Sequence, residues 1–230
     1  MECNICGSTS FIDVRNRKNA MCASCRSYER TRVLFMYVQK FVELGPQSRV
    51  LHMAPEKGLY DYFRTVCGDN YTAVDLNPKV YDGMDVRKCD LCKDVFGFER
   101  DYYDLIVHNH VLEHLPCNET AVLIRLTNSL KDTGVHLFSI PILSGAYEAD
   151  IGPRSLEERE RRFGQDDHVR RFGKDDLHRT LGMVFNTPAE YSLVEEFGAE
   201  ELCRYNIPES MWRGYSGHSV FALRKSDLRV

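Results

Sequence analysis

Short apolar runs alternate with amphipathic stretches through most of the chain after residue 46. The runs have the length and apolar content of buried strands and lie at residues 49–53, 71–75, 104–108 and 135–140. Between the first two, apolar residues recur at helical spacing. A helix from Asn118, a favourable cap, to Lys131 precedes Gly134. This alternation predicts a parallel sheet with helices on both faces, whose ligands lie at the carboxyl ends of the strands.

The two ends of the chain complete this picture. Residues 191–197 and 218–224 are strand candidates, which predict a Rossmann-like α/β sheet of seven strands with an antiparallel last strand. Before the first strand, apolar residues at helical spacing predict a helix that stops at Gly45 and Pro46. We therefore divide the chain into a small module (1–27), a linking helix (28–46) and a main domain (47–230). The arginines around the start of the helix, Arg26, Arg30 and Arg32, form either a solvated face or a contact to an anionic partner.

Composition narrows the function classes. The 230 residues carry 30 Lys and Arg against 34 Asp and Glu, a net charge of −4, so nucleic-acid binding by bulk electrostatics is not expected. With 43% hydrophobic and 28% charged residues, the chain is typical of a globular protein. Its apolar runs are far shorter than the roughly 20 residues of a membrane span. We expect a soluble, cytoplasmic protein.

Four of the nine cysteines have the spacing of a metal site. Two C-x2-C pairs are separated by fifteen residues, and they comprise Cys3, Cys6, Cys22 and Cys25. This spacing predicts a zinc ribbon with one structural, tetrahedral zinc ion. For an intracellular chain we expect no disulfides, and we interpret the further C-x2-C at Cys89 and Cys92 as coincidence and Cys67, Cys117 and Cys203 as small buried hydrophobes.

The turn after the first strand of the main domain lacks the G-x-G-x-x-G pattern of dinucleotide sites. Ala54 and Gly58 are small enough for a ligand to approach the backbone, while Glu56 would repel a pyrophosphate and suit a cationic ligand. Asp75 ends the second strand, where a carboxylate can accept both hydroxyls of a ribose. A nucleoside without phosphates fits this pattern best.

Five motifs in register over residues 49–184 resemble the class I S-adenosylmethionine-dependent methyltransferases. They are residues 49–58, 74–76 (Val-Asp-Leu), 90–91 (Asp-Leu), 103–114 and 126–138. The resemblance implies S-adenosylmethionine as cofactor, held by His52, Ala54, Pro55, Glu56, Gly58, Asp75, Leu76, Asp90, Leu91 and Asn109. One departure is that His52, Ala54 and Glu56 replace the acid and two glycines of the usual first motif.

A narrower resemblance extends outside the five motifs. Residues 27–30, the 52–56 turn and 163–170 are similar to a methyltransferase type 11-like subgroup with a preceding zinc knuckle, often associated with tailoring of glycans or natural products. The motif does not imply a substrate.

Methyl transfer to a hydroxyl requires alignment and removal of a proton. His168 follows a helix with a capping box at Ser155, in a loop (164–173) expected to fold over the cofactor, so it is a candidate general base or a lid anchor. Glu113 and His114 are the next catalytic candidates. A magnesium site would need an oxygen ligand at position 110, where this chain has His110. His110, Glu113 and His114 together would therefore suit a transition metal, and the alternative is that Glu113 and His114 only form hydrogen bonds. Arg170 and Arg171 are either substrate clamps or a solvated pair.

Three functions remain open from the sequence. The first is O-methylation of a small molecule, sugar or natural-product intermediate. The second is methylation of nucleic acid or protein gripped by the zinc module, against which the net charge and the lack of interleaved basic and aromatic residues in 1–26 argue. The third is a zinc-ribbon interaction protein without catalysis. Cofactor binding would discriminate among them.

Overall fold

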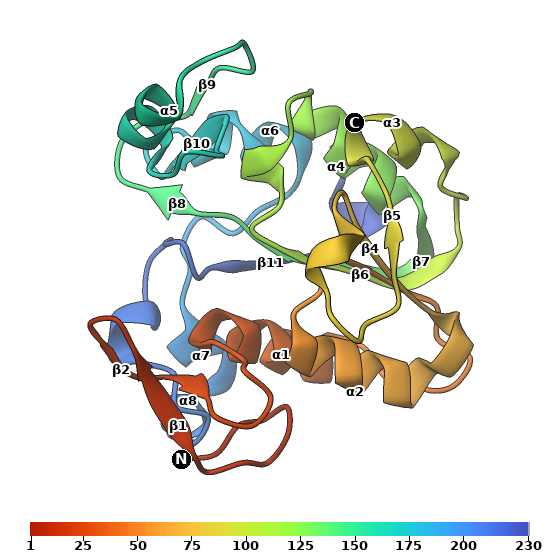
Figure 1. Cartoon of the computed structure of the whole chain (residues 1–230), viewed down its shortest axis with the longest axis vertical. Coiled ribbons are helices and arrows are strands. Elements are labelled where there is room, and N and C mark those ends of the chain that lie inside the picture. Colours follow the sequence, from red (N-terminus) through yellow and green to blue (C-terminus); the bar gives the residue numbers. More distant parts are fainter. Residues whose placement is uncertain (230) are drawn as a thin grey trace.

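The central feature of the protein, described by a computed structural model over residues 1–229, is a six-stranded sheet (Figure 1). Its strand order is β11-β7-β6-β3-β4-β5, and only the pairing of β11 with β7 is antiparallel. The strands are β3 (Val50–Met53), β4 (Tyr71–Asp75), β5 (Val86–Lys88), β6 (Tyr103–Asn109), β7 (Leu130–Ser139) and β11 (Val220–Leu223). The predicted α/β class and the antiparallel last strand are thus confirmed.

Helices cover both faces of this sheet. In Figure 1, α1 (Glu29–Phe41) and α2 (Lys57–Cys67) lie below the sheet, and α3 (Leu91–Asp94), α4 (Glu119–Asn128) and α6 (Leu181–Val184) lie above it. Side chains alternate between the two cores, so Leu105 and Val107 of β6 pack with α1 and α2 while Ile106 packs with α4. Burial on both faces explains why the strands are continuously apolar rather than alternating.

The prediction of seven strands is wrong at residues 191–197. This segment contains α7 (Leu193–Phe197), which is followed by α8 (Ala199–Arg204). Ser192 caps α7 by accepting a hydrogen bond from the backbone N–H of Glu195, and such a cap favours a helix over a strand. The short strand β5, which the sequence pattern did not reveal, forms the opposite edge of the sheet.

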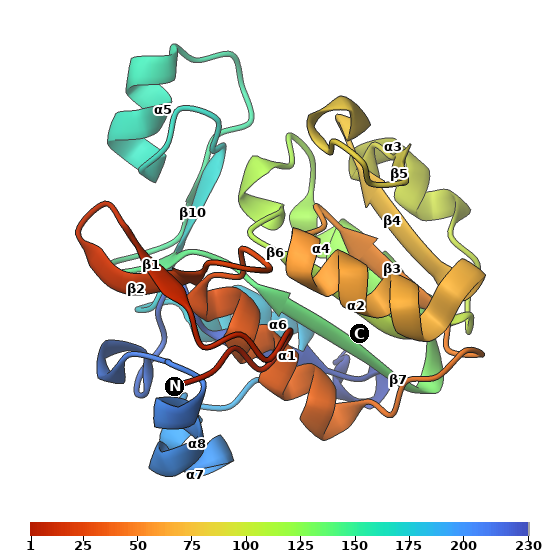
Figure 2. The same cartoon turned by 60° about the horizontal axis from the view of Figure 1, so that its bottom comes forward.

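The N-terminal module contains a hairpin of β1 (Phe11–Val14) and β2 (Arg17–Cys22) that lies beside the start of α1 (Figure 2). The N-terminal end of the module contacts α8, because the Glu2 N–H donates to the Arg204 carbonyl. Arg32 joins the two parts, because its guanidinium donates hydrogen bonds to the carbonyls of Ala20, Ser27, Tyr205 and Asn206. Its side chain is 0% exposed and its partners are backbone carbonyls, so Arg32 belongs neither to a solvated face nor to a contact with an anionic partner. Helix α1 is also more than a link, since its residues 33–38 are buried in the core below the sheet.

A smaller three-stranded sheet stands beside the central one. It consists of β8 (Ile142–Leu143), β10 (Arg170–Gly173) and β9 (Glu148–Ala149), with α5 (Leu156–Phe163) packed near it. Ser155 caps α5 as predicted. The predicted loop over 164–173 is therefore partly strand. Gly173 has no room for a side chain, because a Cβ there would clash with the backbone of Gly145 and Ala146.

Cys92 and Cys117 form a disulfide, with their Cα atoms 5.8 Å apart. The expectation of no disulfides, with Cys117 as an isolated buried residue, is therefore wrong. The bond joins the start of α3 to the segment before α4. Pairing across 25 residues depends on tertiary structure, which spacing alone does not reveal.

Short 3-10 helices connect many of these elements. They are η1 (Gly68–Asn70), η2 (Pro78–Val80), η3 (Val95–Gly97), η4 (Leu112–His114), η5 (Leu177–Arg179), η6 (Glu209–Met211) and η7 (Lys225–Asp227). Within residues 1–229, no helix has the length and apolar character needed to cross a membrane.

Candidate active site

A cavity of about 450 Å³ opens at the carboxyl ends of β3, β4 and β6, where the sheet topology places a ligand. This volume is in the range of small-molecule and cofactor sites. Its walls come from the turns after these strands, the start of α3, the segment around η4, and one residue of the 164–169 segment. They are formed by Met53, Ala54, Val74, Asp75, Leu76, Asn77, Cys89, Asp90, Leu91, Cys92, His110, Val111, His114, Leu115, Pro116 and Asp167.

The charged groups of this cavity are all acidic. Asp75, Asp90 and Asp167 line it, together with two histidines, and no Lys or Arg is among the lining residues of the described chain. A pyrophosphate would meet carboxylates without a compensating cation, whereas a cationic ligand would be attracted. The remaining walls are mainly apolar, as for the base of a nucleoside.

Asp75 is held by two groups of its own loop. Its Oδ1 accepts a hydrogen bond from the backbone N–H of Asn77 at 2.7 Å, and its Oδ2 accepts one from the Tyr81 hydroxyl at 2.7 Å. Burial and the hydrogen bond to Asp75 raise the pKa of Tyr81, so the phenol stays a neutral donor. A carboxylate has about four acceptor positions, so two remain for ligand hydroxyls. Sequence reasoning missed Asn77 and Tyr81, which the motif did not include.

Asp90 and Leu91 lie at the start of α3 and line the cavity. Asp90 caps the helix by accepting a hydrogen bond from the backbone N–H of Cys92 at 3.1 Å. The ammonium of Lys93, 2.8 Å from Asp90, holds the pKa of that carboxyl below its ordinary value. Leu91 is buried and lines the cavity, and Leu76 lines it from β4's end with 61% of its surface exposed. These four predicted positions, Asp75, Leu76, Asp90 and Leu91, therefore come together.

The turn after β3 approaches the cavity through its backbone. Ala54 has φ = +49°, a left-handed conformation that a non-glycine residue adopts rarely, and its N–H donates to the carbonyl of Val74 at 3.0 Å. Apart from glycine, alanine has the smallest side chain, so Ala54 takes little space from the cavity. A ligand can therefore approach the backbone at Ala54, as the sequence predicted.

Three other predicted cofactor residues lie behind this turn rather than along the cavity. His52 is 0% exposed and its Nδ1 lies 3.0 Å from the Tyr71 hydroxyl. Glu56 accepts a hydrogen bond from the Asn109 amide at 2.9 Å, and its other oxygen lies 3.7 Å from His52 Nε2. Burial raises the pKa of Glu56, but the neighbouring His52 and Arg30 and the hydrogen bond from Asn109 outweigh burial, so the net pKa lies below the ordinary value. This network holds the turn in place.

Pro55 and Gly58 are also outside the lining. Pro55 is buried in the turn. Gly58, in the first turn of α2, packs against the N-terminal module, because a Cβ there would lie 3.2 Å from Cys25 Sγ.

The catalytic candidates gather at the histidine end of the cavity. His114 lines it, with its Nδ1 3.2 Å from Asp167 Oδ2 and its ring 4.7 Å from that of His168 between centroids. Glu113 is 0% exposed, and burial raises the pKa of its carboxyl to about 8. His168 is 3% exposed, burial lowers its pKa, and its Nδ1 lies 3.3 Å from the carbonyl oxygen of Phe163. Glu113 and His168 therefore stand behind His114.

Two further residues, Asp167 and His110, line this end. The sequence pattern did not predict Asp167, whereas it indicated His110 as a possible metal ligand beside Glu113 and His114. Asp167, which orients His114, directly precedes the predicted His168, and its carboxylate was the signal that could have identified it. His110 lines the cavity with φ = +52°, its Nε2 2.8 Å from the carbonyl oxygen of Gly217 and its Nδ1 3.4 Å from Glu113.

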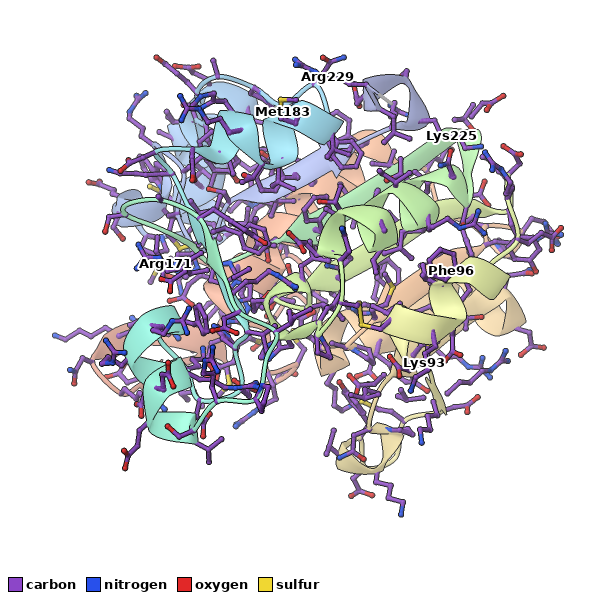
Figure 3. All side chains as sticks on the ribbon, turned by 90° about the horizontal axis from the view of Figure 1, so that it is seen from above. Lys93, Phe96, Arg171, Met183, Lys225 and Arg229 are labelled. Carbon is purple, nitrogen blue, oxygen red and sulfur yellow. A yellow bond between two sulfur atoms is a disulfide. The ribbon has the colours of Figure 1, made fainter. Side chains whose placement is uncertain are left out.

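The predicted substrate arginines are not brought to the cavity. Arg170 is 1% exposed, donates to the carbonyls of Leu112 and Cys117, and lies 3.3 Å from Glu119. Arg171 donates to the Ser144 carbonyl. Figure 3 shows Arg171 well apart from Lys93 and Phe96, which mark the α3 side of the molecule. The geometry gives Arg170 a structural role.

The four cysteines of the N-terminal module converge. Their sulfur atoms all lie within 4.8 Å of one another, and Cys3–Cys25 and Cys6–Cys22 are each 3.6 Å apart. Four thiolates bound to zinc at about 2.3 Å would lie about 3.8 Å apart, so the donors fit a tetrahedral zinc ion.

Comparisons with known proteins show that the fold resembles that of several solved structures. No family model matches the chain, and no curated protein matches it. Among solved structures, a SAM-dependent methyltransferase from Archaeoglobus fulgidus has 17% identity and a TM-score of 0.46, over 84% of this chain and 92% of that one. Phosphoethanolamine N-methyltransferase 2 of Haemonchus contortus with S-adenosyl-L-methionine has 15% identity and a TM-score of 0.47, over 76% and 43%.

A third similar structure is the trans-methyltransferase CalH in complex with SAH. It has 19% identity and a TM-score of 0.33, and the match spans 53% of this chain but only 38% of that one. Identities of this size concern the fold alone.

Proposed function

We propose that this protein transfers a methyl group from S-adenosylmethionine to a hydroxyl of a small polar molecule, such as a sugar or a natural-product intermediate. The observation that carries the proposal is the acidic, phosphate-repelling cavity at the carboxyl ends of β3, β4 and β6. The cofactor is a nucleoside with a sulfonium cation, and it supplies an activated methyl group.

The residues of the cavity fit the parts of this cofactor. Asp75 retains free acceptor positions for the ribose hydroxyls, and Leu91 with Leu76 offers an apolar wall for the adenine. Ala54 leaves space for the chain that carries the sulfonium, and Asp90 adds negative charge. His52, Glu56 and Asn109 support the turn from behind, while Pro55 and Gly58 shape it.

The acceptor enters at the end formed by His114 and Asp167. An alcohol is a weak nucleophile at neutral pH, so its proton must leave as the methyl group arrives. His114 is the member of the catalytic cluster that lines the cavity, and Glu113 and His168 lie directly behind it. We assign acceptor activation to these three residues together. Arg170 is not assigned to the substrate, because its guanidinium already donates to the carbonyls of Leu112 and Cys117 and lies beside the Glu119 carboxylate.

Cofactor binding tests the proposal most directly. Calorimetry should show that S-adenosylhomocysteine binds the wild-type protein and that NAD does not. Asp75→Asn keeps the shape but removes the charge, and loss of charge-assisted hydrogen bonds should weaken binding by roughly 10- to 100-fold. Asp69→Asn is a matched control, because Asp69 is a fully exposed carboxylate outside the cavity. Equal affinity in Asp75→Asn and wild type, or no binding at all, would contradict the proposal.

A further inference from the structure

Glu113, His114 and His168 place three potential ligand atoms close together. One donor atom from each residue lies within 4.8 Å of the other two. The segments that carry them are tied by a backbone hydrogen bond from Val169 N–H to the Glu113 carbonyl, at 2.9 Å. Donors on one ion at about 2.1 Å lie about 3.4 Å apart, so small side-chain rotations would close the set.

The two imidazoles are oriented as those of metal ligands are. His114 directs its Nδ1 at the Asp167 carboxylate, 3.2 Å away, and His168 directs its Nδ1 at the Phe163 carbonyl oxygen, 3.3 Å away. Metal-bound histidines commonly use one ring nitrogen in this way, which fixes the ring and leaves the other nitrogen for the ion. Throughout residues 1–229, no hydrogen bond is made to the Nε2 of either ring.

Glu113 provides an independent indication. Its side chain is 0% exposed, and neither carboxylate oxygen has a hydrogen-bond partner within the described chain, although His110 Nδ1 lies 3.4 Å from its Oε1. A buried carboxylate without partners is costly, and binding a cation is one of the ways in which proteins compensate it. This acid belongs to the same three-residue set whose histidines are already oriented.

We propose that Glu113, His114 and His168 bind a divalent transition metal, zinc or an ion of similar preference, at the acceptor end of the cavity. Two imidazoles and one carboxylate are typical of such ions, whereas magnesium and calcium prefer a shell of oxygen atoms. Three protein ligands leave at least one position open. Because His114 lines the cavity, this position is accessible to a bound acceptor.

The role of the ion rests on the proposed methyl transfer, although its binding does not. A metal-bound hydroxyl loses its proton far more readily than a free one, as zinc-bound water does. The proton passes to solvent by way of Asp167, whose side chain is 62% exposed. The acceptor oxygen then forms a bond to the methyl carbon, the carbon–sulfur bond breaks, and sulfur keeps the electron pair as a thioether.

Zinc stoichiometry of the full chain tests the inference. After equilibration with zinc and removal of free ions, elemental analysis should find about two zinc ions per wild-type chain, one in the ribbon and one in this cluster. Glu113→Gln and His168→Asn, which keep shape and size, should each retain only about one. His178→Asn, at an exposed histidine, and His110→Asn, beside Glu113, should retain about two.

The outcomes separate this inference from the proposed function. One zinc ion in the wild type, or two in Glu113→Gln and His168→Asn, would overturn the metal site. Loss of the second ion in His110→Asn with retention in His168→Asn would overturn the ligand set. Binding of S-adenosylhomocysteine, measured on the same samples, reports separately on the cofactor site and on correct folding of the variants.

Discussion

Gly58 of α2 packs directly against Cys25 of the N-terminal module. A Cβ added to Gly58 would stand 3.2 Å from the Cys25 sulfur and 3.3 Å from its carbonyl oxygen, closer than most such contacts. The four clustered cysteines and the turn that approaches the proposed cofactor are therefore neighbours in space. The two domains predicted from sequence meet at this contact.

Gly58→Ala tests how tightly the two parts are coupled. Alanine favours the helix by about 1 kcal/mol, but its methyl group would press on a sulfur that a zinc ion holds in place. We expect weaker zinc retention in competition with a chelator, and weaker binding of S-adenosylhomocysteine. Once a chelator has removed zinc, the sulfur can move and the difference in stability from wild type should shrink or reverse. Unchanged zinc retention would contradict tight coupling, because it would show that Cys25 can move to accommodate the added methyl group.

Cys22→Ser tests the ribbon itself. Cys22 is fully buried and contributes one of the four sulfur atoms, so the variant should lose about one zinc ion per chain and loosen residues 1–26. Elemental analysis measures the metal, and hydrogen exchange measures the loosening. Cys203→Ser, at an exposed cysteine outside the cluster, is the control. The prediction fails if Cys22→Ser retains as much zinc as Cys203→Ser.

Much of the fold follows from local patterns. The apolar runs located β3, β4, β6 and β7 because strands buried on both faces carry few polar residues, and Asn118 caps α4 as expected. At residues 191–197 the same reasoning failed, because short apolar runs do not distinguish strand from helix. The Ser192-x-x-Glu195 pattern was a helix signal that outweighed them.

The site was predictable only in part. Asp75 and Asp90 follow strands and reach the cavity, since position at the end of a parallel strand determines where a side chain lies. His52 and Arg170 do not, because their partners come from other elements, such as Tyr71 and Leu112. Arg32 bonds to residues more than 170 positions away, which no local pattern indicates.

Arg32→Met should therefore destabilise the protein strongly. Methionine fills a similar volume but removes the guanidinium that donates to the carbonyls of Ala20, Ser27, Tyr205 and Asn206, and we expect a loss of about 3–5 kcal/mol in unfolding free energy. Urea denaturation measures it. Arg204→Met is the matched control, because the exposed Arg204–Glu2 ion pair joins the same two parts at the surface and should contribute little. A similar loss in both variants would contradict a special role for Arg32.

The last prediction concerns acid sensitivity and rests on two buried histidines. His108 is 0% exposed, its two ring nitrogens have no hydrogen-bond partner within residues 1–229, and its ring stacks on Phe138. Burial holds the pKa of His108 well below its ordinary value of 6.5, and burial lowers that of His136 to about 3. Below pH 6.5 the unfolded chain therefore binds protons that the folded chain does not, and stability falls as the pH falls.

Between pH 7.5 and pH 5.5, each such histidine should cost the folded state about 1.4 kcal/mol. His108→Phe keeps a ring that can stack on Phe138 and removes the titrating group, so its loss of unfolding free energy over this range should be about 1.4 kcal/mol smaller than that of wild type. Urea denaturation at the two pH values measures this, with exposed His178→Asn as a control that should behave as wild type does. An equal pH dependence in wild type and His108→Phe would mean that His108 becomes protonated in the folded protein, and that its ring is less isolated from water than its burial indicates.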